Sequence, residues 1–194
     1  NKYDCSGREV HGGNTMNNYR LLVSAILILF ISAAGAFAAT DTAAHDVTMQ
    51  VNEVVLIDLN NTSTITLTTN PPVNGGEDVL GDSDSSKLLQ YTSLVGAAQT
   101  RNITVQWGGA DVAPAGTSLD VIAASVPAGC GTAAPLVTID ATAQPLITGI
   151  TSCATGTGAN GAALTYTFNV DTISSLVVGE VQTVTITYTL TDAG

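Results

Sequence analysis

The sequence predicts an all-β protein built as an antiparallel β-sandwich of about eight or nine strands, preceded by a signal-peptide helix. Three observations predict this fold class. Apolar and polar residues alternate in several segments, turn-forming residues recur between these segments, and no segment of useful length after Ala39 has a helical period. A closed barrel is the less favoured alternative.

The segment 180–191 has the clearest strand pattern in the chain. Val184, Ile186, Tyr188 and Leu190 alternate with threonine, as in a strand with one buried and one exposed face. Residues 184–190 include no charge, proline or glycine, so an unpaired edge there would promote aggregation. We therefore expect this strand to pair within its own sheet or with a neighbouring subunit.

The N-terminal part of the chain differs from the rest. Residues 1–15 are polar and without periodicity, and we interpret them as an untranslated leader or a disordered segment. Residues 16–39 combine a short cationic region, an apolar run and small residues, which is typical of a secretory signal peptide cleaved after Ala38 or Ala39. A transmembrane anchor would need a longer apolar stretch without a cleavage site.

The predicted mature chain, 40–194, is long enough for one domain with its own core. It has two cations, Lys87 and Arg101, and fourteen of the sixteen acidic residues, since Asp4 and Glu9 precede it. This acidic balance repels phosphate backbones and anionic lipid, so it excludes nucleic acid as a partner. The signal predicts a secreted or cell-surface protein, or a periplasmic one, with no stable membrane span after cleavage.

Two cysteines remain in the mature chain, Cys130 and Cys153. An even pair in an exported protein favours a disulfide, which would contribute about 3 kcal/mol to stability. A metal site is the alternative, but two thiols without a nearby histidine make a poor one.

The strands are predicted from their alternation and from the turns between them. Residues 47–51 alternate, the pattern slips at 52–53, and a bulge or a change of sheet is expected at that point. In order, the other candidates before the terminal strand are 54–59, 64–68, 87–95, 101–107, 117–126, 136–139, 145–150 and 163–170.

The segment 77–86 is predicted to be an acidic loop. Its four carboxylates, with three serine hydroxyls nearby, could bind calcium, which takes oxygen ligands. The candidate metal-binding residues are Glu77, Asp78, Asp82 and Asp84. Solvation of an ordinary acidic loop is the alternative interpretation.

Other chemistry is sparse in the mature chain. His45 is its only histidine and lies near the N-terminus, where a catalytic triad would lack a fixed base. The glycine-rich loop 153–161 has neither a lysine nor a following helical pattern, so it does not predict a phosphate site. Trp107 and Tyr91 are candidate ligand contacts, with core packing as the alternative.

The segments 89–95, 114–119 and 185–193 together resemble small secreted bacterial β-sandwich proteins of the cell surface. The ending Thr185-Ile186-Thr187-Tyr188-Thr189-Leu190-Thr191-Asp192-Ala193 is similar to that of WxL-type cell-surface domains, with Tyr188 where those domains carry tryptophan. There is also a looser resemblance to fimbrial subunits. The resemblance implies an immunoglobulin-like or pilin-like sandwich.

These observations predict a non-enzymatic exported protein, structural or adhesive, that requires no cofactor. Residues 40–51 are predicted to supply a strand to another copy or to another surface protein, giving a filament or fimbria-like assembly. The alternative is a carbohydrate-binding module that uses Trp107, Tyr91 or the loop carboxylates, with calcium and glycans as its ligands.

Overall fold

The computed structural model describes residues 41–193, and the predicted leader and signal peptide lie outside these residues. Among the described residues, those from Gln50 onward form one compact unit, and 41–49 lie outside it. The elements are β1 (Val54–Leu59), β2 (Asp82–Leu94), β3 (Arg101–Trp107), β4 (Thr117–Ala124), β5 (Thr132–Ala133), β6 (Val137–Thr138), β7 (Gln144–Ile150), β8 (Cys153–Ala154), β9 (Ala162–Val170), the 3-10 turn η1 (Ile173–Ser175) and β10 (Ile186–Asp192).

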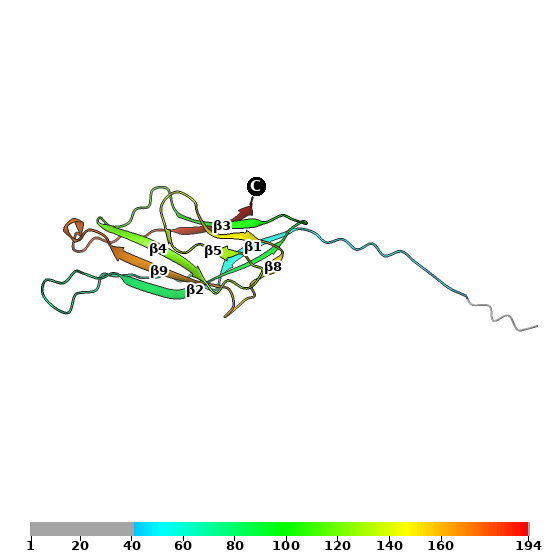
Figure 1. Cartoon of the computed structure of the whole chain (residues 1–194), viewed down its shortest axis with the longest axis horizontal. Coiled ribbons are helices and arrows are strands. Elements are labelled where there is room, and N and C mark those ends of the chain that lie inside the picture. The colour runs from blue at the N-terminus through cyan, green and yellow to red at the C-terminus, as the bar shows by residue number, and fades with distance from the viewer. Residues whose placement is uncertain (1–40, 194) are drawn as a thin grey trace, which may run out of the picture. The chain divides into compact units, whose positions relative to one another are not determined.

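The first sheet has the strand order β1-β2-β9-β4-β6, with β8 also paired to β2. All of its pairings are antiparallel. The long strand β2 organises this sheet because its first half pairs with β9 and its second half with β1. Figure 1 shows β2, β9 and β4 running side by side.

The second sheet has the order β10-β3-β7-β5 and is also antiparallel. β10 lies at its edge and pairs with β3 in an unbroken register from Ile186 opposite Trp107 to Asp192 opposite Arg101. The terminal strand therefore has a hydrogen-bonded partner on one side.

The core lies between the inner faces of these two sheets. On β3 the buried positions are every second residue, and β9 alternates in the same way through Ala162, Leu164 and Tyr166. Burial of each large apolar side chain contributes about 1.5–3 kcal/mol. The chain is thus all-β with antiparallel sheets, as predicted, and its arrangement is consistent with a β-sandwich.

The predicted strand count of eight or nine differs from the ten strands among the described residues. Three of them, β5, β6 and β8, have only two residues each. Pairs this short leave almost no periodic signal in a sequence.

The sequence prediction was wrong for 64–68, which forms no strand in the described structure. Backbone hydrogen bonds join Asn60 to Leu88 and Asn70 to Leu80. The chain between these two points is two residues longer on the Asn60 side, and residues 61–69 are not paired with β2. Ile65 and Leu67 nevertheless pack against the core, which explains their alternation.

The predicted loop 77–86 needs a similar correction, because β2 begins at Asp82. Asp82 and Asp84 pair with Phe168 and Tyr166 of β9, and the register shifts between Asp84 and Lys87. Backbone hydrogen bonds to β9 hold this end of β2, and its side chains need not be apolar. Its composition therefore resembles that of a loop.

The predicted strand 47–51 is also absent from the described structure. Residues 41–53 have no regular secondary structure, and Val47, Met49 and Val51 are 67%, 88% and 82% exposed. Alternation predicts which side chains share a face, but a strand also requires a partner for its backbone.

Candidate functional site

Arg101 is the most extensively bonded side chain of the compact unit. It is the first residue of β3 and lies on the strand's inner face, in phase with Ile103 and Val105. Only 1% of Arg101 is exposed. A buried guanidinium is costly unless its donors are satisfied, so its partners are structurally important.

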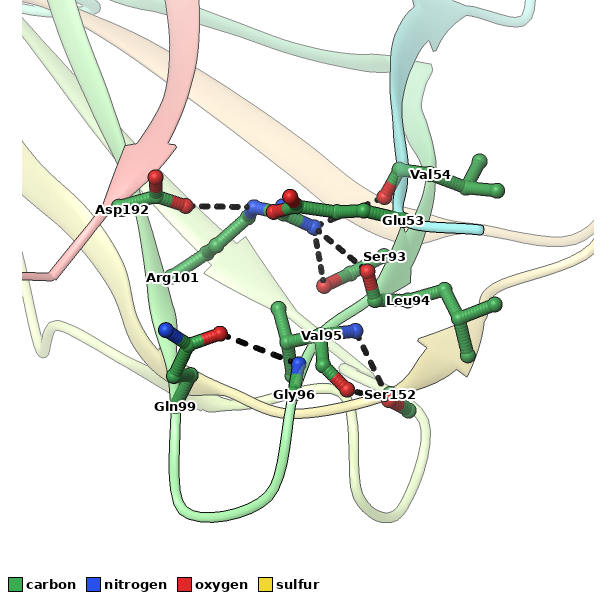
Figure 2. Close-up of polar contacts among 10 residues, drawn as sticks. All are labelled: Glu53, Val54, Ser93, Leu94, Val95, Gly96, Gln99, Arg101, Ser152 and Asp192. Carbon is green, nitrogen blue, oxygen red and sulfur yellow. Dashed lines mark hydrogen bonds and ion pairs between the residues drawn. The ribbon is translucent and has the colours of Figure 1, made fainter. Parts of the chain in front are cut away.

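The partners, drawn in Figure 2, belong to β1, β2 and β10 or to the residue just before β1. The Nη1 group of Arg101 donates to the Val54 carbonyl at 2.8 Å and also approaches Ser93 Oγ at 3.2 Å and the Leu94 carbonyl at 3.4 Å. Nε donates to Asp192 Oδ1 at 2.9 Å, and Nη2 pairs with the Glu53 carboxylate.

This arrangement fixes one end of the compact unit. A single guanidinium joins the start of β1, the end of β2 and the end of β10, and so links the two sheets. The Glu53 and Asp192 side chains are 59% and 78% exposed, so the two carboxylates reach solvent while the cation stays buried. We call Arg101, Glu53, Val54 and Asp192 the Arg101 clamp.

The turn between β2 and β3 lies beside the Arg101 clamp and is held separately. Gln99 Oε1 accepts a hydrogen bond from the Gly96 amide at 3.1 Å, and Ser152 Oγ accepts one from the Val95 amide at 3.0 Å (Figure 2). The Gln99 contact closes the turn on itself, and the Ser152 contact attaches it to the chain just before Cys153.

The predicted disulfide between Cys130 and Cys153 is confirmed, with 5.5 Å between the two Cα atoms. It joins the loop after β4 to β8. Tyr91 supports the same region, because its hydroxyl donates to the Cys130 carbonyl at 2.7 Å. Burial raises the pKa of Tyr91 to about 12, so this phenol remains a donor at neutral pH.

Trp107 and Tyr91, the predicted ligand contacts, are both core side chains. Trp107 is 9% exposed and Tyr91 is 3% exposed. Sugar recognition by stacking needs an accessible aromatic face. The burial of both rings favours core packing, and ligand contact by Trp107 or Tyr91 stays a prediction.

The four candidate calcium ligands are placed along a turn and the start of β2. The Glu77 carboxylate accepts from the amide and side chain of Asn74, and these bonds lower its pKa. Asp84 accepts from Ser86 Oγ and the Ser86 amide, which lowers its pKa in the same way. Asp82 bonds the adjacent Ser83 amide.

These bonds are local, because each joins a carboxylate to a residue one to three positions away. Residues 41–193 contain no group of three or more acidic, histidine or cysteine side chains arranged to hold a metal ion. Calcium binding at this loop stays a prediction.

Lys87 is a second buried cation, to which the sequence alone assigned no role. It is 3% exposed, and its ammonium group donates to the Ser63 carbonyl and to Asn61 Oδ1, each at 2.5 Å. These bonds hold the segment after β1 against the inner side of β2.

A signal for both cations was present in the sequence. Lys87 is in phase with Leu89 and Tyr91, and Arg101 is in phase with Ile103 and Val105. A cation at the inward phase of an alternating strand must find buried acceptors. The phase therefore marks Lys87 and Arg101 as structural anchors.

One shallow depression lies between β6 and β7, and its lining includes Val137, Asp140 and Gln144. No helix among the described residues has the length and hydropathy to cross a membrane. Comparisons of this chain with family models, curated proteins and solved structures give no match.

Proposed function

We propose that this chain is a non-enzymatic, exported structural or adhesive subunit of the cell surface that assembles by strand addition. In this proposal the apolar run and small residues of 16–39 direct export, and the compact unit is an immunoglobulin-like or pilin-like sandwich. Other copies of the chain, or other surface proteins, are its partners.

The observation that carries the proposal is the segment immediately before β1. Val47, Met49 and Val51 alternate with polar residues and are all exposed. An alternating segment of this kind gains both hydrogen bonds and apolar burial when it joins the edge of another sheet. Without a partner strand, the exposed segment makes no such hydrogen bonds and buries no apolar surface.

The Arg101 clamp supports this role because it anchors the end of the segment. Glu53 and Val54 are bonded to Arg101. A force applied to residues 46–51 would therefore be transmitted through the Arg101 clamp to both sheets. A subunit that transmits tension through its N-terminal segment needs an anchor of this kind.

Assembly of the purified chain tests the proposal. Light scattering and electron microscopy should detect oligomers or filaments whose amount rises with protein concentration. Met49→Asp should reduce assembly because it places a charge on the apolar face of the segment. Gln50→Asp, which adds the same charge on the other face, is the matched control. A chain that stays monomeric at high concentration and binds no cell-surface material would contradict the proposal.

A further inference from the structure

The two sides of β10 can be assigned from its hydrogen bonds. The Thr185 carbonyl accepts from the Gly108 amide, and the Ala193 amide donates to the Thr100 carbonyl. In an antiparallel ladder the backbone groups of alternate residues face the same neighbour. Thr187 and Thr189 therefore bond to β3, whereas the N–H and C=O groups of Val184, Ile186 and Tyr188 point to the opposite side.

This opposite side, the outer edge of β10, has no strand paired to it among the described residues. Natural sheets usually protect such an edge with lysine, proline, a bulge or a covering element. Residues 184–190 contain no charge, proline or glycine, and the register with β3 is unbroken. The edge is thus chemically suited to accept a strand.

The segment 61–69 packs against the same core without joining either sheet. Ile65 and Leu67 contact the core from this segment, and Val184 and Ile186 contact it from the terminal strand. The side chains of Ile65, Leu67, Val184 and Ile186 are only partly buried. An added strand with apolar residues on one face would therefore bury more of this surface.

We infer that the outer edge of β10 at Ile186 and Tyr188, together with Val184 just before the strand, is the acceptor site for residues 46–51 of a second copy of this chain. The inference rests on the proposed function and names the surface that the donated strand uses. Six extended residues span about 20 Å, which suits the length of β10. Val47 and Met49 would extend the apolar face of β10, which faces the core. Thr48 and Gln50 would extend the opposite face of β10, which carries Thr187 and Thr189.

The Arg101 clamp favours a second copy over the chain's own segment. Arg101 bonds both Glu53 and Asp192, so the segment joins the compact unit where β10 ends. To lie along its own β10, the chain would have to reverse direction within 52–53. A segment from a second copy has no such restraint.

A mixing experiment with two complementary variants tests the inference. Met49→Asp disables the donor segment and leaves the β10 edge intact. Val184→Pro removes an outward-facing N–H and leaves the donor intact, with Val184→Ala as its control because alanine keeps the N–H. Each disabled variant alone should associate about tenfold more weakly than the native chain. Their mixture should form a 1:1 dimer, detected by light scattering.

Hydrogen exchange gives a second readout that does not depend on a substitution. On assembly of the native chain, the amides of Val184, Ile186 and Tyr188 should gain protection, whereas those of Thr187 and Thr189 should already be protected by β3. This alternation would support the β10 edge even if Val184→Pro failed to fold.

The outcomes separate the inference from the proposed function. If Met49→Asp blocks assembly but Val184→Pro assembles like the native chain, and the three amides gain no protection, the acceptor is elsewhere and the inference is overturned while strand donation stands. If Met49→Asp lowers the melting temperature of a strict monomer, the segment pairs within its own chain and the second copy is excluded. If the chain neither assembles nor responds to either variant, both proposals fail.

Discussion

Tyr166 of β9 and Tyr188 of β10 share a hydrogen bond between their hydroxyl groups, with 2.5 Å between the oxygens. The two strands belong to different sheets, so this bond crosses the core. A polar contact here needs both partners, because an unpaired buried hydroxyl would lose its hydration without compensation. The bond fixes β10 relative to the first sheet while its outer edge stays unpaired.

The phenols should make the fold sensitive to alkali. Burial raises the pKa of Tyr188, and the adjacent Tyr166 raises it further; burial also raises the pKa of Tyr166. In the unfolded chain these phenols ionise near pH ~10. Above that pH the unfolded state binds fewer protons than the folded state, so the free energy of unfolding should fall until pH reaches the folded pKa values.

Urea denaturation between about pH 8 and pH 11 would measure this loss of stability. Tyr188→Phe should show a shallower decline in stability, because one titrating phenol has been removed. Part of the decline should remain, because Tyr166 and Tyr91 still titrate. If the free energy of unfolding of the native chain did not change across this range, the raised pKa values of the buried phenols would be contradicted.

Replacing Arg101 should destabilise the compact unit. Arg101→Met removes the donors that the Val54 carbonyl, Ser93 and Leu94 use, and we expect a loss of about 3 kcal/mol in the free energy of unfolding. Asp192→Asn keeps the buried cation and changes only an exposed partner, so it should cost about 1 kcal/mol or less. Chemical denaturation monitored by circular dichroism would compare them, and equal losses would argue against a central role for the guanidinium.

Lys87→Met should loosen the segment 61–69. The substitution keeps most of the apolar stem and removes the ammonium group that bonds Asn61 and Ser63. We expect a stability loss of about 1–3 kcal/mol and faster proteolytic cleavage within 61–69. Ser63→Ala is the comparison: it removes only the Ser63 Oγ acceptor and keeps the Ser63 carbonyl, so its effect should be smaller. Unchanged cleavage of Lys87→Met would show that packing of Ile65 and Leu67 alone holds the segment.

Removing the disulfide should lower stability without changing the fold. The double variant Cys130→Ser, Cys153→Ser should lose about 3 kcal/mol, because its unfolded chain is no longer closed into a loop. A reductant should bring the native protein to the same melting temperature and leave the variant unaffected. A reductant that destabilises both proteins equally would point to an effect unrelated to this bond.

The single tryptophan provides a direct test of core packing against ligand binding. Trp107 is the only tryptophan in the chain and is buried, so its fluorescence should be short in wavelength and weakly quenched by acrylamide. Titration with oligosaccharides, with or without calcium, should leave the emission unchanged. A saturable spectral shift would restore the carbohydrate-binding alternative.

The sequence alone determined the all-β class, most of the long strands and the disulfide. These follow from local alternation, as in β3 and β9, and from the pairing of two cysteines in a chain with a signal-like start. It also distinguished the two faces of 64–68, since Ile65 and Leu67 do contact the core. What alternation encodes is which side chains share a face, because that depends only on the pleat of an extended chain.

Only the tertiary structure decided which extended segments have hydrogen-bonded partners. The residue excess between Asn60 and Asn70 removes 64–68 from the sheet, whereas the ladder with β9 makes a strand of the acidic residues 82–84. The same holds for the cations: Arg101 and Lys87 are local features in the sequence, but their acceptors come from distant segments that only folding brings together. Strand pairing and burial of charge are non-local, and for that reason the edge of β10 and the Arg101 clamp emerged from the three-dimensional arrangement.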